Sequence, residues 1–321
     1  TAVGHQSLYA NTTGIHNTGI GRDALKLNTT AHYNTAIGRY SMGANTTGGY
    51  NTAVGTNSLC ANTTASNNTA VGYNALTAST TGTGNVAIGV QTLDASTTAN
   101  YNTAVGNYAL STTITGEQNT AVGYESLANN TAHFNCAFGF QALETNTTGS
   151  NNTALGHNAM DVNTTGSNCT AVGSQALSAN TTGSANIAVG ENCLALLTTA
   201  SNNTAIGSNA GYSMTTGHSN VLIGRYTGKD CDTGIGNVGI GFYALSADQN
   251  GTTDSTYNTC IGYESGKKIS TGSNNTSVGG GALTAATTGG YNTAVGREAL
   301  YTATTANYNT ALGYRAGKNT T

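Results

Sequence analysis

The chain of 321 residues contains no proline and no tryptophan, and only 7% of its residues are charged. Its net charge of −3 excludes the basic footprint typical of a nucleic-acid-binding protein. No hydrophobic run approaches the length of a transmembrane helix and no segment resembles a signal peptide, so we expect no membrane insertion in this segment. Glycine, in contrast, reaches 44 residues, far more than a helical protein tolerates.

The chain is organised by one repeated motif, Asn-Thr-Ala-Val-Gly, as at 68–72. With its glycine taken as position 0, the motif occurs 19 times, and sixteen of the 18 intervals are 17 residues. A fixed period of this kind is the signature of a solenoid or array. It predicts a single repetitive domain over 1–321, with a shortened coil near 124–139 and an insertion loop at 246–258. Because both ends of the chain lie inside a repeat, we expect a fragment of a longer protein.

Seventeen residues cannot hold a helix–turn–helix unit, and glycine and β-branched residues dominate each repeat. The pattern therefore predicts an all-β fold, a parallel β-solenoid of about 19 coils. Position −1, as at Val71, is apolar in every copy and is expected to point into the core, with Leu76 at position +4 as a second core row. Position 0, Gly72, is invariant, which indicates a positive φ or a close backbone approach.

The two remaining motif positions indicate packing as well. Asn68 represents position −4, where stacked asparagines are expected to form a ladder with about 4.8 Å between coils. Position −2 is small in all copies but one, Leu222. If this row faced outward, as alternation with Val71 implies, something would have to pack closely against it. We therefore expect either a very thin solenoid or a homo-oligomer that buries the alanine face.

The pattern Thr-Ala-Val-Gly-x-x-Ala, followed by a small residue and glycine, resembles the head repeats of YadA-like trimeric autotransporter adhesins. Aligned at position 0, the three extra residues of each coil fall in turns such as 61–64. Similar long Asn-Thr-Ala-Val-Gly arrays also look like those of bacteriophage tail-fibre and tailspike proteins. The resemblance implies a left-handed β-roll, a homotrimer, and an extracellular fibre on a virion tail or cell surface that binds a host glycan or protein receptor. It carries over no ligand residue, because it covers only scaffold positions.

Position −5 is aromatic in seven copies and offers candidate ligand-binding residues. Rings in adjacent coils could form a platform for a sugar, although a ladder that packs coil against coil explains the same row. The row comprises Tyr33, Tyr50, Tyr101, Phe134, Tyr257, Tyr291 and Tyr308. Asp248 and Asp254 in the insertion are further candidates; their oxygens could hold Ca²⁺, but without regular ligand spacing they are better explained as solvated turns.

The sequon Asn-x-Thr recurs at position +7 and predicts N-glycosylation wherever the host glycosylates. The same tetrapeptide, Asn-Thr-Thr-Gly, also makes a good turn, and this explanation is favoured. The possible acceptors are Asn11, Asn28, Asn45, Asn62, Asn146, Asn163 and Asn180.

No set of residues indicates catalysis, a metal or a cofactor. The six cysteines lie at six different positions of the repeat, which predicts buried small side chains rather than a disulfide ladder or a metal site. We therefore expect a structural and adhesive fibre and no enzyme. Two alternatives remain: a self-assembling extracellular filament, and an ice-binding solenoid suggested by the threonine rows at −3, +8 and +9.

Overall fold

The computed structural model describes residues 1–247 and 255–320 and confirms an all-β parallel β-solenoid of about 19 coils with a 17-residue repeat. The chain divides into two compact units, which we call unit 1 (Thr1–Ala154) and unit 2 (Leu155–Thr321). Each is described by itself. Asp248 and Asp254, and with them most of the insertion expected at 246–258, lie outside the described residues.

Each coil contributes one short strand, and the strands within a unit pair in parallel with the strand of the next coil. The strands of unit 1 are β1 (Ala2–Val3), β2 (Thr18–Ile20), β3 (Thr35–Ile37), β4 (Thr52–Val54), β5 (Thr69–Val71), β6 (Val86–Ile88), β7 (Thr103–Val105), β8 (Thr120–Val122) and β9 (Cys136–Phe138). The strand β10 (Thr153–Leu155) contains the last two residues of unit 1 and the first residue of unit 2.

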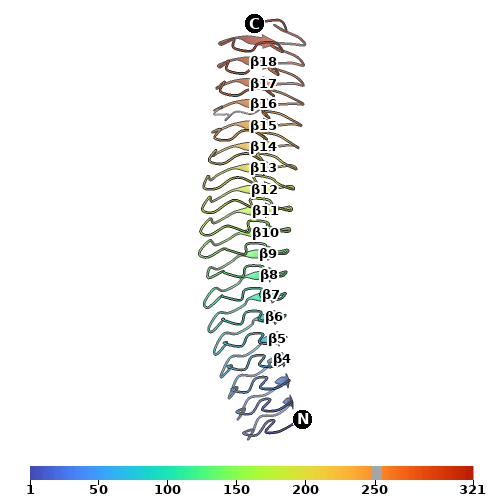
Figure 1. The fold of residues 1–321 in the computed structure, drawn as a ribbon, viewed down its shortest axis with the longest axis vertical. Helices are drawn as coiled ribbons and strands as arrows, with labels where there is room; N and C mark the ends of the chain where they lie inside the picture. The colour runs from blue at the N-terminus through green and yellow to red at the C-terminus, as the bar shows by residue number, and fades with distance from the viewer. Residues whose placement is uncertain (248–254, 321) are drawn as a thin grey trace. The chain divides into compact units, whose positions relative to one another are not determined.

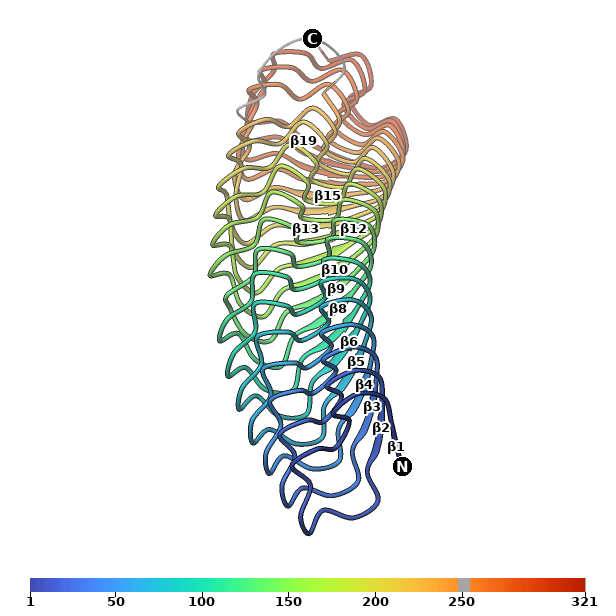
Figure 2. The same ribbon diagram turned by 60° about the horizontal axis from the view of Figure 1, so that its bottom comes forward.

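The strands of unit 2 are β11 (Thr170–Val172), β12 (Ile187–Val189), β13 (Thr204–Ile206), β14 (Val221–Ile223), β15 (Val238–Ile240), β16 (Thr259–Ile261), β17 (Thr276–Val278), β18 (Thr293–Val295) and β19 (Thr310–Leu312). In both units identical repeat positions are paired, as Ala70 is with Ala87 and Val71 with Ile88. The strands of each unit follow one another coil by coil (Figure 1), and Figure 2 shows turns making up most of each coil.

The side of each strand that faces the core is opposite to the side predicted from side-chain size. Ala70 at position −2 is completely buried, whereas Val71 at position −1 is half-buried at the surface. The interior is narrow, and the large side chain of each coil comes from position +4, as Leu76 does. A leucine on one wall leaves room only for alanine on the other, so the always-small row marks a tight core and not a covered outer face.

Leucine at position +4 has an unexpected backbone conformation. Leu76 has φ of +51°, in the left-handed region that bulky residues rarely adopt. Gly211, Gly228 and Gly266 take the same position with φ of 57° to 61°, so the turn keeps its backbone conformation where glycine replaces leucine.

The space that these glycines leave is refilled. The apolar side chains three residues later, Met214, Cys231 and Ile269, are fully buried or nearly so. Leu222, the one large residue at position −2, also fills this space: an added Cβ on Gly211 or Gly228 would lie 3.1 or 2.7 Å from its methyl groups. Large and small side chains have therefore exchanged walls here.

The invariant glycine at position 0 satisfies both predicted conditions. Gly72 has φ of +137°, and a Cβ on it would lie 2.2 Å from the carbonyl oxygen of Gly89 in the next coil. The backbones of successive coils thus approach each other where no side chain fits.

The shortened coil keeps its core positions by losing one threonine of the turn. Ala132 is 5% exposed and takes the place of the small residue at position +10. Asn130 donates its Nδ2–H to the carbonyl of Ala132, two residues on instead of the usual three. The deletion therefore tightens the turn alone, as expected.

Candidate functional site

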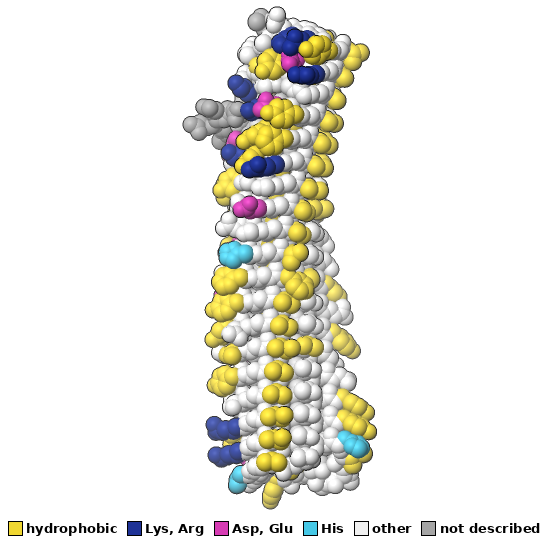
Figure 3. All heavy atoms as spheres, turned by 90° about the vertical axis from the view of Figure 1, so that its right-hand side faces the viewer, with side chains coloured by type: hydrophobic (Ala, Val, Ile, Leu, Met, Phe, Trp, Pro, Cys, Tyr) yellow, Lys and Arg dark blue, Asp and Glu magenta, His cyan; other side chains and the backbone are white. Residues whose placement is uncertain are grey.

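The outward face of the strands, which we call the strand face, carries the side chains of positions −3 and −1. Ile88, Phe138 and Ile206 at position −1 are 39%, 39% and 40% exposed, although all 19 copies are apolar. Position −3 is threonine in 14 copies and β-branched or cysteine in the others. Figure 3 shows columns of hydrophobic side chains that run from coil to coil along the visible surface. The strand face is thus an array of aliphatic and threonine side chains that remains partly exposed among residues 1–247 and 255–320.

The asparagine row at position −4 is buried and links coil to coil, but its main links are not the amide-to-amide bonds of the predicted ladder. Asn68 accepts a hydrogen bond at Oδ1 from the backbone N–H of Asn85 (2.8 Å), and its Nδ2 donates to the carbonyl of Gly82 (2.8 Å). Each asparagine side chain therefore provides hydrogen-bond partners for backbone N–H and C=O groups next to the start of the strand. In unit 2 some amides also donate to the preceding Oδ1, as from Asn292 to Asn275 at 3.0 Å. The row is scaffold.

In a second asparagine row, at position +7, direct amide-to-amide bonds are the main links between coils. Nδ2 of Asn45 donates to Oδ1 of Asn28 (2.8 Å), and Nδ2 of Asn62 donates to Oδ1 of Asn45 (2.7 Å). The same pattern joins Asn146 to the preceding coil, at 2.7 Å. The sequence alone is interpreted as placing these asparagines in turns at the surface. Their recurrence at one repeat position could have indicated the ladder.

The seven asparagines proposed above as glycosylation acceptors all lie in this row. Asn11 is partly exposed; the other six, Asn28, Asn45, Asn62, Asn146, Asn163 and Asn180, are 0% exposed. A glycan would be attached at Nδ2, the atom that donates the ladder bonds inside the solenoid. The fold therefore leaves no accessible acceptor at six of the seven sites.

The aromatic row at position −5 stacks along the solenoid. Tyr33 and Tyr50 have ring centroids 4.9 Å apart and Tyr291 and Tyr308 5.0 Å apart, with nearly parallel planes. Tyr101 and Tyr257 stand alone, each beside a glycine of the preceding coil, Gly84 and Gly236. Within a stack the faces of neighbouring rings cover each other, so this row packs coil against coil and presents ring edges to solvent.

Charge and aromatic side chains gather in unit 2 along positions +1, +2 and +5, which we call the ridge. Tyr226 stacks on Tyr243 at 4.9 Å, and the Arg225 guanidinium carbon lies 4.5 Å from the Tyr226 ring centroid. Lys267 pairs with Glu264 at 3.2 Å and lies over the ring of Tyr243. Figure 3 shows these charged side chains gathered in the coils toward the C-terminus.

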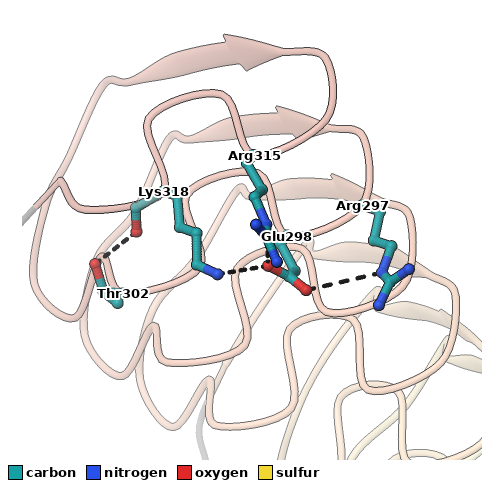
Figure 4. Close-up of polar contacts among 5 residues, drawn as sticks. All are labelled: Arg297, Glu298, Thr302, Arg315 and Lys318. Atoms are coloured by element: carbon teal, nitrogen blue, oxygen red, sulfur yellow. Dashed lines mark hydrogen bonds and ion pairs between the residues drawn. The ribbon is translucent and has the colours of Figure 1, made fainter.

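At the end of the ridge, the carboxylate of Glu298 lies between three cations (Figure 4). Lys318 Nζ and Arg315 Nε donate to its Oε2 at 2.6 and 2.8 Å, and Arg297 Nε lies 3.7 Å from Oε1. The hydrogen bonds from Lys318 and Arg315 lower the pKa of Glu298 to about 2. Lys318 is itself held in place, because its carbonyl accepts a hydrogen bond from Thr302 Oγ1 at 2.7 Å.

The cysteines are all free thiols, and four are buried as predicted: Cys169, Cys193, Cys231 and Cys260. Cys60 and Cys136 are half-buried. Burial raises the pKa of Cys193 to about 12 and that of Cys260 further. In residues 1–247 and 255–320, no three His, Cys, Asp or Glu side chains are grouped to hold a metal ion, and no helix is long and apolar enough to cross a membrane.

No protein-family model and no curated protein matches this chain. The class that the geometry defines is that of a structural repeat protein: a parallel β-solenoid with an uncovered strand face and, in unit 2, a ridge of charged and aromatic side chains.

Proposed function

We propose that this chain is the repetitive shaft of an extracellular fibre in which three copies pack through their strand faces and exposed side chains contact receptors on a host surface. The location would be a virion tail or a cell surface, and no catalysis is assigned. The number of copies comes from the resemblance to trimeric adhesin repeats.

The observation that supports packing is the contrast between position −1, the last residue of each strand, and position +1, two residues later in the turn. Position +1 varies from His5 to Arg22 to Glu191, as expected of a row that meets water. Position −1 stays apolar in all 19 copies although the core does not need it. Extended apolar surface of this kind marks an interaction site, and a repetitive row is best matched by the same row of an identical chain.

The proposal is tested by placing charge on the strand face. V71K/I88K puts two lysines into the interface between copies, where an unpaired charge is costly, and is expected to give single chains by light scattering. In a single chain the same lysines would extend into water, so the variant still folds. The matched control is Y73K in the same coil, since Tyr73 is 51% exposed at position +1; it is expected to leave the assembly intact. Equal particle masses for both variants would contradict the proposal.

One observation also supports ice binding. The threonine row at −3 and the apolar row at −1 both face outward on one sheet. Successive coils place these side chains about 4.8 Å apart, a regular array on a parallel sheet. Thermal hysteresis of the unmodified protein, abolished by V71K/I88K, would favour this alternative, because a face buried between copies is unavailable to ice.

A further inference from the structure

The ridge of unit 2 is interrupted at one coil by a hollow of about 380 Å³, which we call the notch. At positions +1 and +2 this coil has Gly280 and Gly281, while the coil before carries Tyr263 and Glu264 and the coil after carries Arg297 and Glu298. Two coil spacings, about 10 Å, therefore separate the walls of the notch. Tyr301 completes the lining.

The backbone does not require glycine at Gly280. Its φ is not in the left-handed region, and the nearest atom to an added Cβ would be the carbonyl oxygen of Tyr263, at 4.0 Å. Gly279 beside it is different, because a Cβ there would lie 2.7 Å from the backbone of Gly296. The missing side chain at Gly280 thus has one structural effect, which is to keep the notch open.

The opening leaves one face of an aromatic ring free. Phe242 stacks on Tyr263 with centroids 5.7 Å apart and planes 12° apart, and so covers the face toward the preceding coil. On the opposite side stands Gly280, and Tyr263 is 58% exposed. A ligand ring in the notch would occupy the next step of the stack, about 5 Å from Tyr263, as the rings of adjacent coils do elsewhere.

The floor of the notch offers a hydrogen-bond donor. Elsewhere on this row, the backbone N–H of Val90 donates to Oδ1 of Asn107 in the next coil at 3.0 Å. At the corresponding place after Gly280 stands Arg297, which has no acceptor atom. Among residues 1–247 and 255–320, the N–H of Gly280 meets no acceptor, so it is available to an oxygen atom of a ligand.

The charge around the notch favours an acidic ligand. Glu264 is paired with Lys267, and the single carboxylate of Glu298 faces Arg297, Arg315 and Lys318. Arg297 is 72% exposed and has only the long 3.7 Å contact to Glu298. A ligand carboxylate could therefore take a bidentate hydrogen bond from its guanidinium.

We propose that the notch binds an acidic saccharide, with the apolar face of a sugar ring on Tyr263 and its carboxylate on Arg297. A ring face, an N–H donor and nearby carboxylates that accept from hydroxyl groups match a sugar better than an aromatic side chain, which has no hydroxyls to place. This inference rests on the proposed adhesive function, because it names the class of receptor.

The test uses the full chain and two probes that differ in one group, glucuronic acid and glucose, with binding measured by saturation-transfer NMR. The unmodified protein is expected to bind glucuronic acid at least fivefold more tightly than glucose. G280Y fills the notch and is expected to abolish binding of both probes. The control T56Y adds the same side chain at position +1 in unit 1 and should change nothing. R297Q should weaken glucuronic acid binding about tenfold and leave glucose unaffected.

Light scattering of the same samples separates the two proposals. Trimers that bind neither probe would overturn the notch and leave the fibre intact. Undiminished binding by G280Y would also overturn the notch, because the sugar would then bind elsewhere. Single chains that bind glucuronic acid, and lose it in G280Y, would support the notch and contradict the fibre.

Discussion

Units 1 and 2 have the same repeat but differ in how strictly they keep it. Unit 1 has leucine or methionine at every position +4 and only three of the ten lysines and arginines. Unit 2 has all four glycines at position +4, the insertion, four buried cysteines and the other seven cations. Between Arg39 and Arg225 there is neither lysine nor arginine. The scaffold therefore tolerates the exchange of large and small core side chains between its two walls. Most of the charged side chains lie in the unit whose coils depart from the consensus.

The largest expected effect concerns a position at which the two units do not differ. G72A in unit 1 and G279A in unit 2 each put a Cβ within 2.7 Å of the next backbone, at φ of 137° and 132°. We expect each to cost roughly 3 kcal/mol or more. G280A, next to Gly279, should stay within about 0.5 kcal/mol of the unmodified protein. Urea unfolding midpoints measure all three, and a midpoint for G72A equal to that of G280A would refute the coil-contact explanation.

The core exchange distinguishes the units. L222A removes the side chain that fills the space beside Gly211 and Gly228, and should destabilise unit 2 by about 2–4 kcal/mol. A70L in unit 1 forces a second large side chain against the leucine wall, at a cost of about 1–3 kcal/mol.

The exchange can also be reversed within one coil. G211L/L222A restores the leucine at position +4 and the alanine at position −2 of unit 1, and position +4 already has the backbone that leucine adopts elsewhere. This double variant should unfold at a higher urea concentration than either single variant. A double variant no more stable than L222A would mean that the two walls are not coupled.

The rate at which cysteine thiols react should also differ between the units, and we expect this difference to be a smaller effect than the changes in stability above. In the native protein, a thiol reagent at pH 8 is expected to label Cys60 first and Cys136 more slowly, because burial raises the pKa of the Cys136 thiol. The four cysteines of unit 2 should react only after denaturation. Rapid labelling of Cys193 in the folded chain would contradict its burial.

The smallest effect is expected at acid pH. Because the folded pKa of Glu298 is lowered to about 2, its contribution to stability is present above the ordinary carboxyl value near 4.3 and is lost as the pH falls toward 2. E298Q should remove that part of the acid dependence. In the unmodified protein it is seen as a lower protection factor of the last coil at pH 3 than at pH 6, where the protection factor is the intrinsic rate of hydrogen exchange at each pH divided by the observed rate. E125Q in unit 1 is the control. An unchanged pH dependence in E298Q would exclude this ion-pair cluster as its source.

Period and composition were enough to predict the solenoid, the coil boundaries, the shortened turn and the glycine at position 0. They did not predict which side of each strand faces the core. The alternation of side chains shows that Ala70 and Val71 face opposite ways, but it does not show which of them faces inward. The larger side chain was placed in the core, whereas the space beside Leu76 admits only alanine.

The candidate sites were harder to predict. Stacking of Tyr33 on Tyr50 follows from their common repeat position, but the burial of Asn28 and Asn45 does not, since asparagine in Asn-Thr-Thr-Gly also suits an exposed turn. The notch exists because Gly280 has no side chain. Among the 44 glycines of the chain, only the structure distinguishes those that the backbone conformation requires from those, such as Gly280, that it does not require.

The central claim is that the strand face is an interface between copies, and the mass of the unmodified protein in solution tests it most directly. Light scattering at neutral pH should give three times the chain mass of 32.2 kDa. A folded particle of 32.2 kDa that keeps its strand face in water would contradict the account.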